Sequence, residues 1–180
     1  MTPRRQTVSK AQLLVDGSDT AFRSFIHDFL AFSALVSDIR SGFGAHLGLT
    51  GIAYTTLISI NYLQGRTGVG INAIADHLHL SGAFITTEVA KLVRGGLVHK
   101  GVNAKDKRRV LLTVTPAGRK LLSELAVLQA PVNDALFDCL SSAEFGQLRH
   151  LISRLVPCGT RALSLQSYLM SPLENEAGIS

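Results

Sequence analysis

The segment from residue 74 to residue 118 constrains the fold of this chain more than any other part of the sequence. A short apolar helix pattern ends at Leu78, and Leu80-Ser81 restarts the chain. A second helix pattern then runs to the stop signal Gly95-Gly96, with apolar residues at helical spacing at Ile85, Val89 and Leu92. Two apolar runs follow, at 97–98 and 110–112, around a hydrophilic loop. Helix, turn, helix and hairpin in this order predict a winged helix-turn-helix, which places its second helix in the major groove of DNA.

Positive charge is concentrated in the same segment. The chain carries 18 Lys and Arg residues against 13 Asp and Glu, a net charge of +5. Residues 91–109 hold seven of the basic residues and one acidic residue, so the rest of the chain has a slight negative excess. A basic excess confined to one helix end and one hairpin is typical of a surface that contacts a polyanion. The alternative is a solvated loop that is basic by chance.

Composition bounds the remaining possibilities. At 180 residues, 46% hydrophobic and 17% charged, the chain can bury a sizeable core and still keep apolar surface for self-association. No run of about 18 apolar residues occurs, so we expect no membrane helix, and the basic N-terminus lacks the apolar stretch of a signal peptide. Two cysteines make no disulfide framework, and we expect a cytoplasmic protein. Flexible segments are expected at residues 1–17 and 171–180.

Helical patterns flank the central segment on its N-terminal side. Asp16-Gly17-Ser18-Asp19 is a helix start signal with two candidate capping residues. The helix should end near Ser41-Gly42, and Thr50 can cap the next one. The first of these helices carries one strong apolar stripe, formed by Phe22, Phe25, Ile26, Phe29, Phe32 and Val36.

The C-terminal side is helical as well. Pro116 stands at the first position of a helix that Pro131 should kink or interrupt. Ser141 and Glu144 have capping-box spacing and open another helix, which Pro157-Cys158-Gly159 should break. The apolar face of this last helix comprises Phe145, Leu148, Leu151, Ile152 and Leu155.

These patterns predict a mainly α protein with a small β-hairpin wing. The winged helix-turn-helix lobe spans 49–114, a dimerisation helix and hinge span 18–48, and C-terminal dimerisation helices span 115–170. The flanking helices cannot bury their apolar stripes against so small a lobe, so we expect a helical dimerisation layer built from two copies of the chain. An intramolecular bundle in a monomer is the alternative. The homodimer is favoured because two-fold proteins match palindromic DNA sites.

The ordered residues of the central segment resemble the MarR family of bacterial transcription regulators. The resemblance rests on Leu49-Thr50 opening a helix, Ile74-Ala75 in the next helix and Gly96-Leu97-Val98 after the second helix of the motif. The spacing D-x-R-x-V and T-x-x-G follows, in Asp106, Arg108, Val110, Thr115 and Gly118. The resemblance implies a homodimer that binds a pseudo-palindromic operator, usually as a repressor, and that is released by a small molecule or an oxidant.

The second helix of the motif supplies candidate contacts to DNA. Ser81 is its expected N-cap, and the hydroxyl and methyl groups opposite its apolar face can touch base edges or the thymine methyl. Lys91 and Arg94 lie late in the helix and suit phosphates better. The alternative is that these residues only face solvent. The DNA-contacting set predicted on this helix is Ser81, Ala83, Thr86, Thr87, Lys91 and Arg94.

The hairpin loop supplies the second set of contacts. The resemblance implies that Arg108 enters the minor groove, where narrow A·T-rich segments attract a guanidinium. Asp106 is expected to hold Arg108 or the wing backbone, since phosphates repel a carboxylate. Lys105, Lys107 and Arg109 would displace counterions from phosphates.

A small-molecule site is expected where the first helix meets the second. The resemblance places such a site between the dimerisation layer and the winged lobe, and either Arg40 or His46 could receive a carboxylate or phenolate. Ordinary packing at the junction is the alternative. We expect an aromatic or acyl-carboxylate effector near Arg40, Phe43, His46, Ile52, Tyr54 and His27.

Other groups of polar residues and cysteines give weaker indications of a functional site. Asp76, His77 and His79 fall at the turn of the motif, where polar surface explains them, and we expect no metal site. Cys139 and Cys158 are expected to be buried and inert, with a redox-switched sensor as the alternative function. No nucleophile motif or phosphate-binding glycine loop occurs, so we expect no catalytic site and no cofactor, and an enzyme is a remote alternative.

Overall fold

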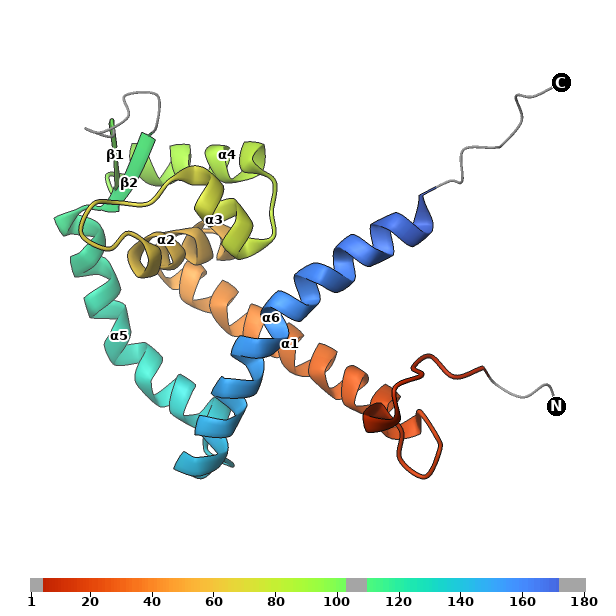
Figure 1. Cartoon of the computed structure of the whole chain (residues 1–180). Coiled ribbons are helices and arrows are strands. Elements are labelled where there is room, and N and C mark those ends of the chain that lie inside the picture. The colour runs from red at the N-terminus through yellow and green to blue at the C-terminus, as the bar shows by residue number, and fades with distance from the viewer. Residues whose placement is uncertain (1–4, 103–109, 172–180) are drawn as a thin grey trace, which may run out of the picture. The chain divides into compact units, whose positions relative to one another are not determined.

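The computed structural model describes residues 5–102 and 110–171 of the chain (Figure 1). Within these ranges the fold is mostly helical with one two-stranded antiparallel hairpin, as the sequence predicted. A short 3-10 turn, Ala11–Leu13, precedes the first helix. The other elements are α1 Thr20–His46, α2 Gly51–Leu63, α3 Ile71–Leu78, α4 Gly82–Arg94, β1 Val98–Val102, β2 Val110–Val114, α5 Pro116–Phe137 and α6 Ser142–Met170.

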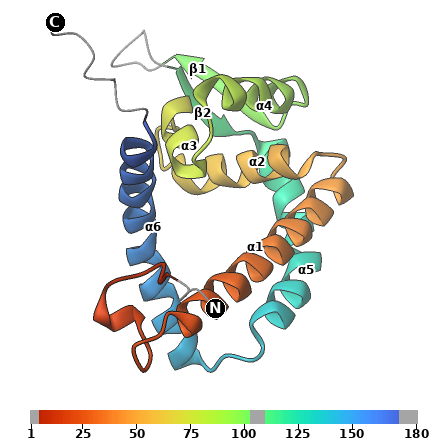
Figure 2. The same cartoon turned by 90° about the vertical axis from the view of Figure 1, so that its right-hand side faces the viewer.

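The winged lobe is built from α2, α3, α4 and the hairpin, which lie together in both views (Figure 2). The hairpin pairs Val98 with Val114 and Val102 with Val110. Val69 and Leu112 form an additional antiparallel bridge beside the hairpin. All of these elements contribute to one apolar core, which comprises Ala53, Leu57, Ile60, Val69, Ile74, Ala75, Ile85, Val89, Leu92, Val98, Leu112 and Val114.

Helix α1 continues past the stop expected near Ser41-Gly42 and ends at His46. The expectation was wrong because a glycine weakens a helix without ending it, and Gly42 lies in the helix with open space beside it, whereas Gly44 serves packing. A Cβ on Gly44 would lie 3.0 Å from the carbonyl oxygen of Thr50 and 3.2 Å from the Cα of Gly51. Gly44 therefore lets the end of α1 approach the start of α2, and the chain turns only at Gly48, whose φ is +69°.

Pro131, which was expected to kink or interrupt its helix, and Pro157, which was expected to break the last one, both lie inside continuous helices. Helix α5 runs through Pro131 and α6 runs through Pro157. A proline removes one backbone hydrogen bond and disfavours the turn before it, but it does not force the helix to stop. The capping box at Ser141 is confirmed, because its hydroxyl accepts from the Glu144 amide while the Glu144 carboxylate accepts from the Ser141 amide.

The segment before α1 makes defined hydrogen bonds. Asp19 is buried, and its Oδ2 accepts from the Thr7 amide at 2.7 Å and from the Arg23 Nε at 2.9 Å. The hydrogen bond from Arg23, followed by that from the Thr7 amide, holds the pKa of the Asp19 carboxyl well below its usual range. Asp19 thus occupies the N-cap position without capping the helix, since its side chain binds the preceding segment instead.

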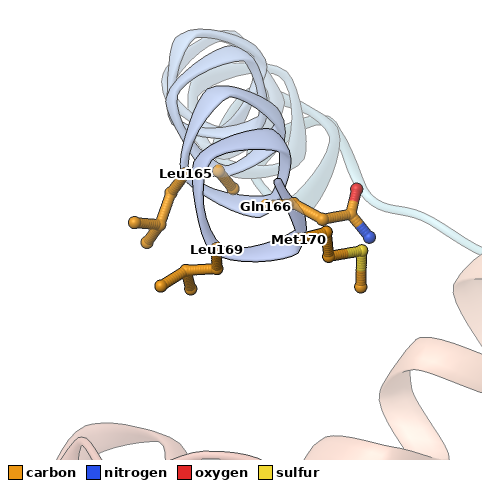
Figure 3. A pocket seen from close by; sticks show the side chains of 5 residues that line it. Leu165, Gln166, Leu169 and Met170 are labelled. Atoms are coloured by element: carbon orange, nitrogen blue, oxygen red, sulfur yellow. The ribbon is translucent and has the colours of Figure 1, made fainter. Parts of the chain in front are cut away.

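The chain divides into two compact units, residues 1–127 and 128–180. In the second unit Phe137 and Phe145 pack edge to face, with ring centroids 5.7 Å apart. The C-terminal part of α6 carries an apolar depression of about 250 Å³ (Figure 3), lined by Ala162, Leu165, Gln166, Leu169 and Met170. Of the helices described, none is long and apolar enough by itself to cross a membrane, although α1 and α2, bent by 91°, satisfy that test jointly.

Candidate nucleic-acid interface

Helix α4 is fixed to the lobe by one face and by its first turn. Ile85, Val89 and Leu92 are 0–2% exposed and lie in the core, as their spacing predicted. The Ser81 hydroxyl accepts a hydrogen bond of 3.2 Å from the Phe84 amide, which confirms Ser81 as the N-cap. The orientation of α4 is therefore set by core packing and by a cap, and its opposite face is left to the surface.

The opposite face of α4 is exposed and carries little charge. The Thr86 hydroxyl donates to the Gly82 carbonyl at 2.7 Å, and the Thr87 hydroxyl donates to the Ala83 carbonyl at 3.2 Å. Each hydroxyl has given its proton to the helix, so it presents an acceptor and a methyl group outward. Such groups suit the cytosine amino group and the thymine methyl in a major groove. The exposed residues of the predicted set are Ser81, Ala83, Thr86, Thr87, Lys91 and Arg94.

Phe84 is a surface residue of α4 that the sequence argument missed. It is 43% exposed, although it stands directly before the buried Ile85. Its position off the stripe formed by residues 85, 89 and 92 was the available signal. A ring at this place can contact thymine methyl groups, as Phe does in other DNA-reading proteins.

Glu88 is the second residue missed. It is 3% exposed, and its Oε1 pairs with the Nζ of Lys91 at 2.6 Å. The spacing of three residues on a helix was the available signal for this pair. Lys91 is therefore the exposed half of an ion pair, and the phosphate contact expected of it stays a prediction.

The base of the wing is tied to the rest of the lobe. The side chain of Gln64 accepts from the Val114 amide at 2.8 Å, and the Thr115 hydroxyl donates to the Gly96 carbonyl at 2.7 Å. Gly118 leaves no room for a Cβ, which would overlap the Leu97 carbonyl and the Val114 side chain. The loop that this base supports lies outside the described residues, and with it the predicted contacts Lys105, Asp106, Lys107, Arg108 and Arg109.

The predicted effector residues divide into a group at the α1–α2 junction and one distant residue. The rings of Phe43 and Tyr54 meet edge to face with centroids 6.2 Å apart, and Tyr54 is buried. Arg40 and Ile52 are half-buried, and His46, the last residue of α1, is exposed. His27 lies on α1 about 24 Å before Phe43 at 1.5 Å per residue, so the structure does not bring it to this junction.

The remaining residues considered in the sequence are the polar ones at the turn of the motif and the two cysteines. His79 adopts a left-handed conformation with φ +53° and closes α3, which accounts for a polar residue there. No three His, Cys, Asp or Glu side chains gather into a metal-binding group within residues 5–102 and 110–171. The expectation of buried thiols was wrong, because Cys139 and Cys158 are both exposed. Arg161 donates to the Cys158 sulfur at 3.0 Å.

Comparison with known proteins places this geometry in a wider context. No known family profile matches the chain. It is 26% identical over 105 residues to the HTH-type transcriptional regulator BilQ of Clostridium symbiosum, an alignment that covers 58% of this chain and 73% of that protein. This is a likeness in sequence to a protein named as a regulator.

Solved structures show the likeness in fold. A cysteine-to-serine mutant of E. coli MarR in complex with operator DNA matches with a TM-score of 0.61 at 19% identity, covering 77% of this chain and 95% of that one. A structure of the transcriptional regulator SlyA gives 0.65 at 16% identity, covering 78% and 97%. These matches confirm the winged helix-turn-helix fold and the resemblance to structures of the MarR family.

Proposed function

We propose that this chain is a transcriptional regulator of the MarR type that binds double-stranded DNA at a pseudo-palindromic operator, as a homodimer and as a repressor. The observation that carries the proposal is the exposed, hydroxyl-bearing face of α4, held on a closed core and followed by a hairpin. The likeness to a MarR structure in complex with operator DNA supports it. Helix α4 would be the recognition helix and would contact base edges in the major groove, and the basic wing would bind the flanking backbone and minor groove.

The homodimer is supported by apolar surface outside the winged lobe. Phe25 and Phe29 on α1 are 54% and 42% exposed, and their rings lie 6.0 Å apart. Helix α6 has no buried residue, and Leu151 and Leu155 on it are exposed. Exposed apolar area of this extent marks an interaction surface rather than a solvated one. A second copy of the chain would cover it and would set two recognition helices at the spacing of two half-sites.

Selection from a pool of random DNA duplexes tests the DNA-binding proposal. The full chain should enrich an inverted repeat whose half-sites are centred about one helical turn, 10–10.5 base pairs, apart. A variant with Thr86→Ala and Thr87→Ala should lose preference for that repeat while keeping its attraction to random duplex, because the hydroxyls do not contact phosphates. Enrichment of no sequence, or of the same repeat by the variant, would contradict the role of α4.

We further propose that an aromatic or acyl-carboxylate effector binds at the α1–α2 junction and releases the operator. The half-buried ring of Phe43 packs on the buried ring of Tyr54, and Arg40 and His46 carry polar groups one helical turn before and after Phe43. The effector can shift the protein only by its preference for an arrangement that does not fit DNA. His46→Ala with Tyr54→Phe should keep operator affinity and lose the response to benzoate or octanoate. If the double variant leaves the operator at the same effector concentration as the parent, the effector does not bind at this junction.

A redox switch is the second candidate for the release mechanism. Cys139 and Cys158 are exposed, and oxidation requires access to the sulfur. If peroxide releases the operator and carboxylates do not, Cys139→Ser and Cys158→Ser, made separately, identify the sulfur that responds. If peroxide still releases the operator from both serine variants, neither cysteine is the sole sensor.

A further inference from the structure

Glu88 places a carboxylate in the core of the recognition helix. The residues that share its face, Ile85, Val89 and Leu92, are 0–2% exposed, and Glu88 is 3% exposed. A carboxylate removed from water is stabilised only by the groups that pair with it, and an apolar side chain would fill such a position at no electrostatic cost. Core packing therefore does not account for the charge at this position.

The two ends of the Glu88–Lys91 pair lie in different environments. The Glu88 side chain is buried, and its second oxygen, Oε2, has no hydrogen-bond partner among the described residues. The Lys91 side chain is 45% exposed, and its Nζ lies 2.6 Å from Glu88 Oε1. The buried carboxylate thus anchors a surface lysine by its charged end, on the helix that carries the proposed base contacts.

This arrangement bears on how the helix attracts DNA. A free lysine beside a phosphate displaces a condensed counterion, and it strengthens binding to every sequence alike. A lysine whose charge is cancelled by an adjacent carboxylate adds much less to that attraction. Weak sequence-independent binding raises the ratio of operator to random DNA, which is what a regulator requires.

We propose that Glu88 is a specificity-determining residue, which holds Lys91 against α4 and cancels its charge so that sequence-independent binding stays weak. The proposal rests on the DNA-binding function proposed above. Glu88 touches no base in this account. It acts through Lys91, and its effect is on random DNA rather than on the contacts that read the operator.

The test is the affinity of the full chain for a random-sequence 20-base-pair duplex over a series of KCl concentrations. Glu88→Gln keeps the shape and removes the charge. It should bind random duplex about three- to tenfold more tightly near 0.1 M salt, with a salt slope steeper by about one. Glu124→Gln is the matched control, because it removes the same charge from an exposed pair with Lys120, 3.8 Å apart on α5. This control should bind as the parent does.

A second variant does not depend on the first one folding. Glu88→Gln with Lys91→Gln removes the whole pair, including the buried charge, and leaves the local net charge unchanged. Its salt slope should equal that of the parent, because the pair already counts as neutral. A slope shallower by about one would overturn the proposal, since Lys91 would then be a phosphate contact in the parent.

Two further outcomes separate this inference from the function beneath it. In the first, the Glu88→Gln variant shares the parent's circular dichroism and melting temperature and yet binds random duplex no more tightly than the parent. That outcome would overturn the role of Glu88 and leave the proposed DNA-binding function standing. A parent chain that shows no salt-dependent binding to random duplex and enriches no operator would overturn the proposed function as well.

Discussion

The winged lobe and helix α6 hold their apolar residues in opposite ways. Leu57, Ile60 and Ile74 in the lobe are 0% exposed, whereas Leu155 and Leu169 on α6 are 50% and 69% exposed. Both regions are helical and both show regular apolar spacing, so periodicity alone does not separate them. The difference lies in burial: α2, α3, α4 and the hairpin form one shared apolar core, and no residue described in α6 is buried.

A single chain buries the apolar residues of the lobe by itself, whereas it leaves the apolar residues of α6 exposed. The stability of the lobe should be a property of the single chain and should not change with protein concentration. The stability of the helical layer should rise with concentration, because association stabilises only the folded partner-bound state. Substitutions can therefore break one region while sparing the other.

The largest effect is expected from Phe25→Asp with Phe29→Asp on α1. Two carboxylates on the exposed stripe would oppose burial against a second copy, since a charge buried without a partner is strongly unfavourable. The variant should be a monomer or insoluble, and it should not bind the operator in a mobility-shift assay. Ser24→Asp with Ala31→Asp adds the same charges to α1 at exposed positions off the stripe, and it should remain a dimer. A stable stripe variant that still runs as a dimer and binds DNA would reject the assignment.

The next effect is expected inside the lobe. Leu57→Ala removes a fully buried side chain and should lower the free energy of unfolding by about 2–5 kcal/mol. Leu155→Ala on α6 removes the same atoms from an exposed position, so its cost should appear only as weaker dimerisation. Chemical denaturation at low and high protein concentration measures both. Equal losses for the two variants, independent of concentration, would show that the two regions do not differ in burial.

Smaller effects are expected in the wing. Arg108→Ala should weaken operator binding by about 1–3 kcal/mol if its contact is specific, whereas Lys107→Ala should weaken operator and random DNA equally and flatten the salt slope by about one. Titrations of both variants at several salt concentrations separate the two roles. Indifference to both substitutions would remove the wing from the contact surface.

The smallest effect concerns the segment before α1. The pKa of the Asp19 carboxyl is lowered in the folded chain, first by the hydrogen bond from Arg23. The stability that the ionised carboxylate adds to the folded state is therefore fully present above the unfolded pKa of about 3.9, and it is lost as the pH falls further. Protection of the Thr7 amide from hydrogen exchange should therefore persist at neutral pH and decline on acidification. Asp19→Asn should reduce it at neutral pH, and Asp16→Asn should not. Equal protection in all three proteins would leave Asp19 without this role.

The sequence was sufficient for features that depend on local spacing. The buried face of α4, the caps at Thr50, Ser81 and Ser141, and the hairpin all follow from periodicity and short-range hydrogen bonding. Features that depend on tertiary neighbours were missed or wrong. The end of α1 was expected near Ser41-Gly42 because the close approach of Gly44 to α2 is invisible in sequence, and the helices are not interrupted at Pro131 and Pro157.

The candidate site shows the same division. Thr86 and Thr87 were identified because they lie opposite an apolar stripe, and the structure leaves both exposed. Glu88 was overlooked because a charged residue in a helical pattern is ordinarily assigned to solvent, and only the packing of α4 on the core reveals its burial. Sequence spacing fixes the face of a helix more reliably than the environment of each residue on that face.

The stoichiometry of the complex on selected operator DNA tests the central claim most directly. Sedimentation of the full chain with a duplex carrying both half-sites, and with one carrying a single half-site, gives the number of chains bound and the affinity for each. Two chains per duplex, with affinity at least about tenfold lower on the single half-site, would agree with a two-fold regulator whose winged lobes read adjacent turns of DNA. One chain per duplex, with equal affinity for both DNAs, would contradict it.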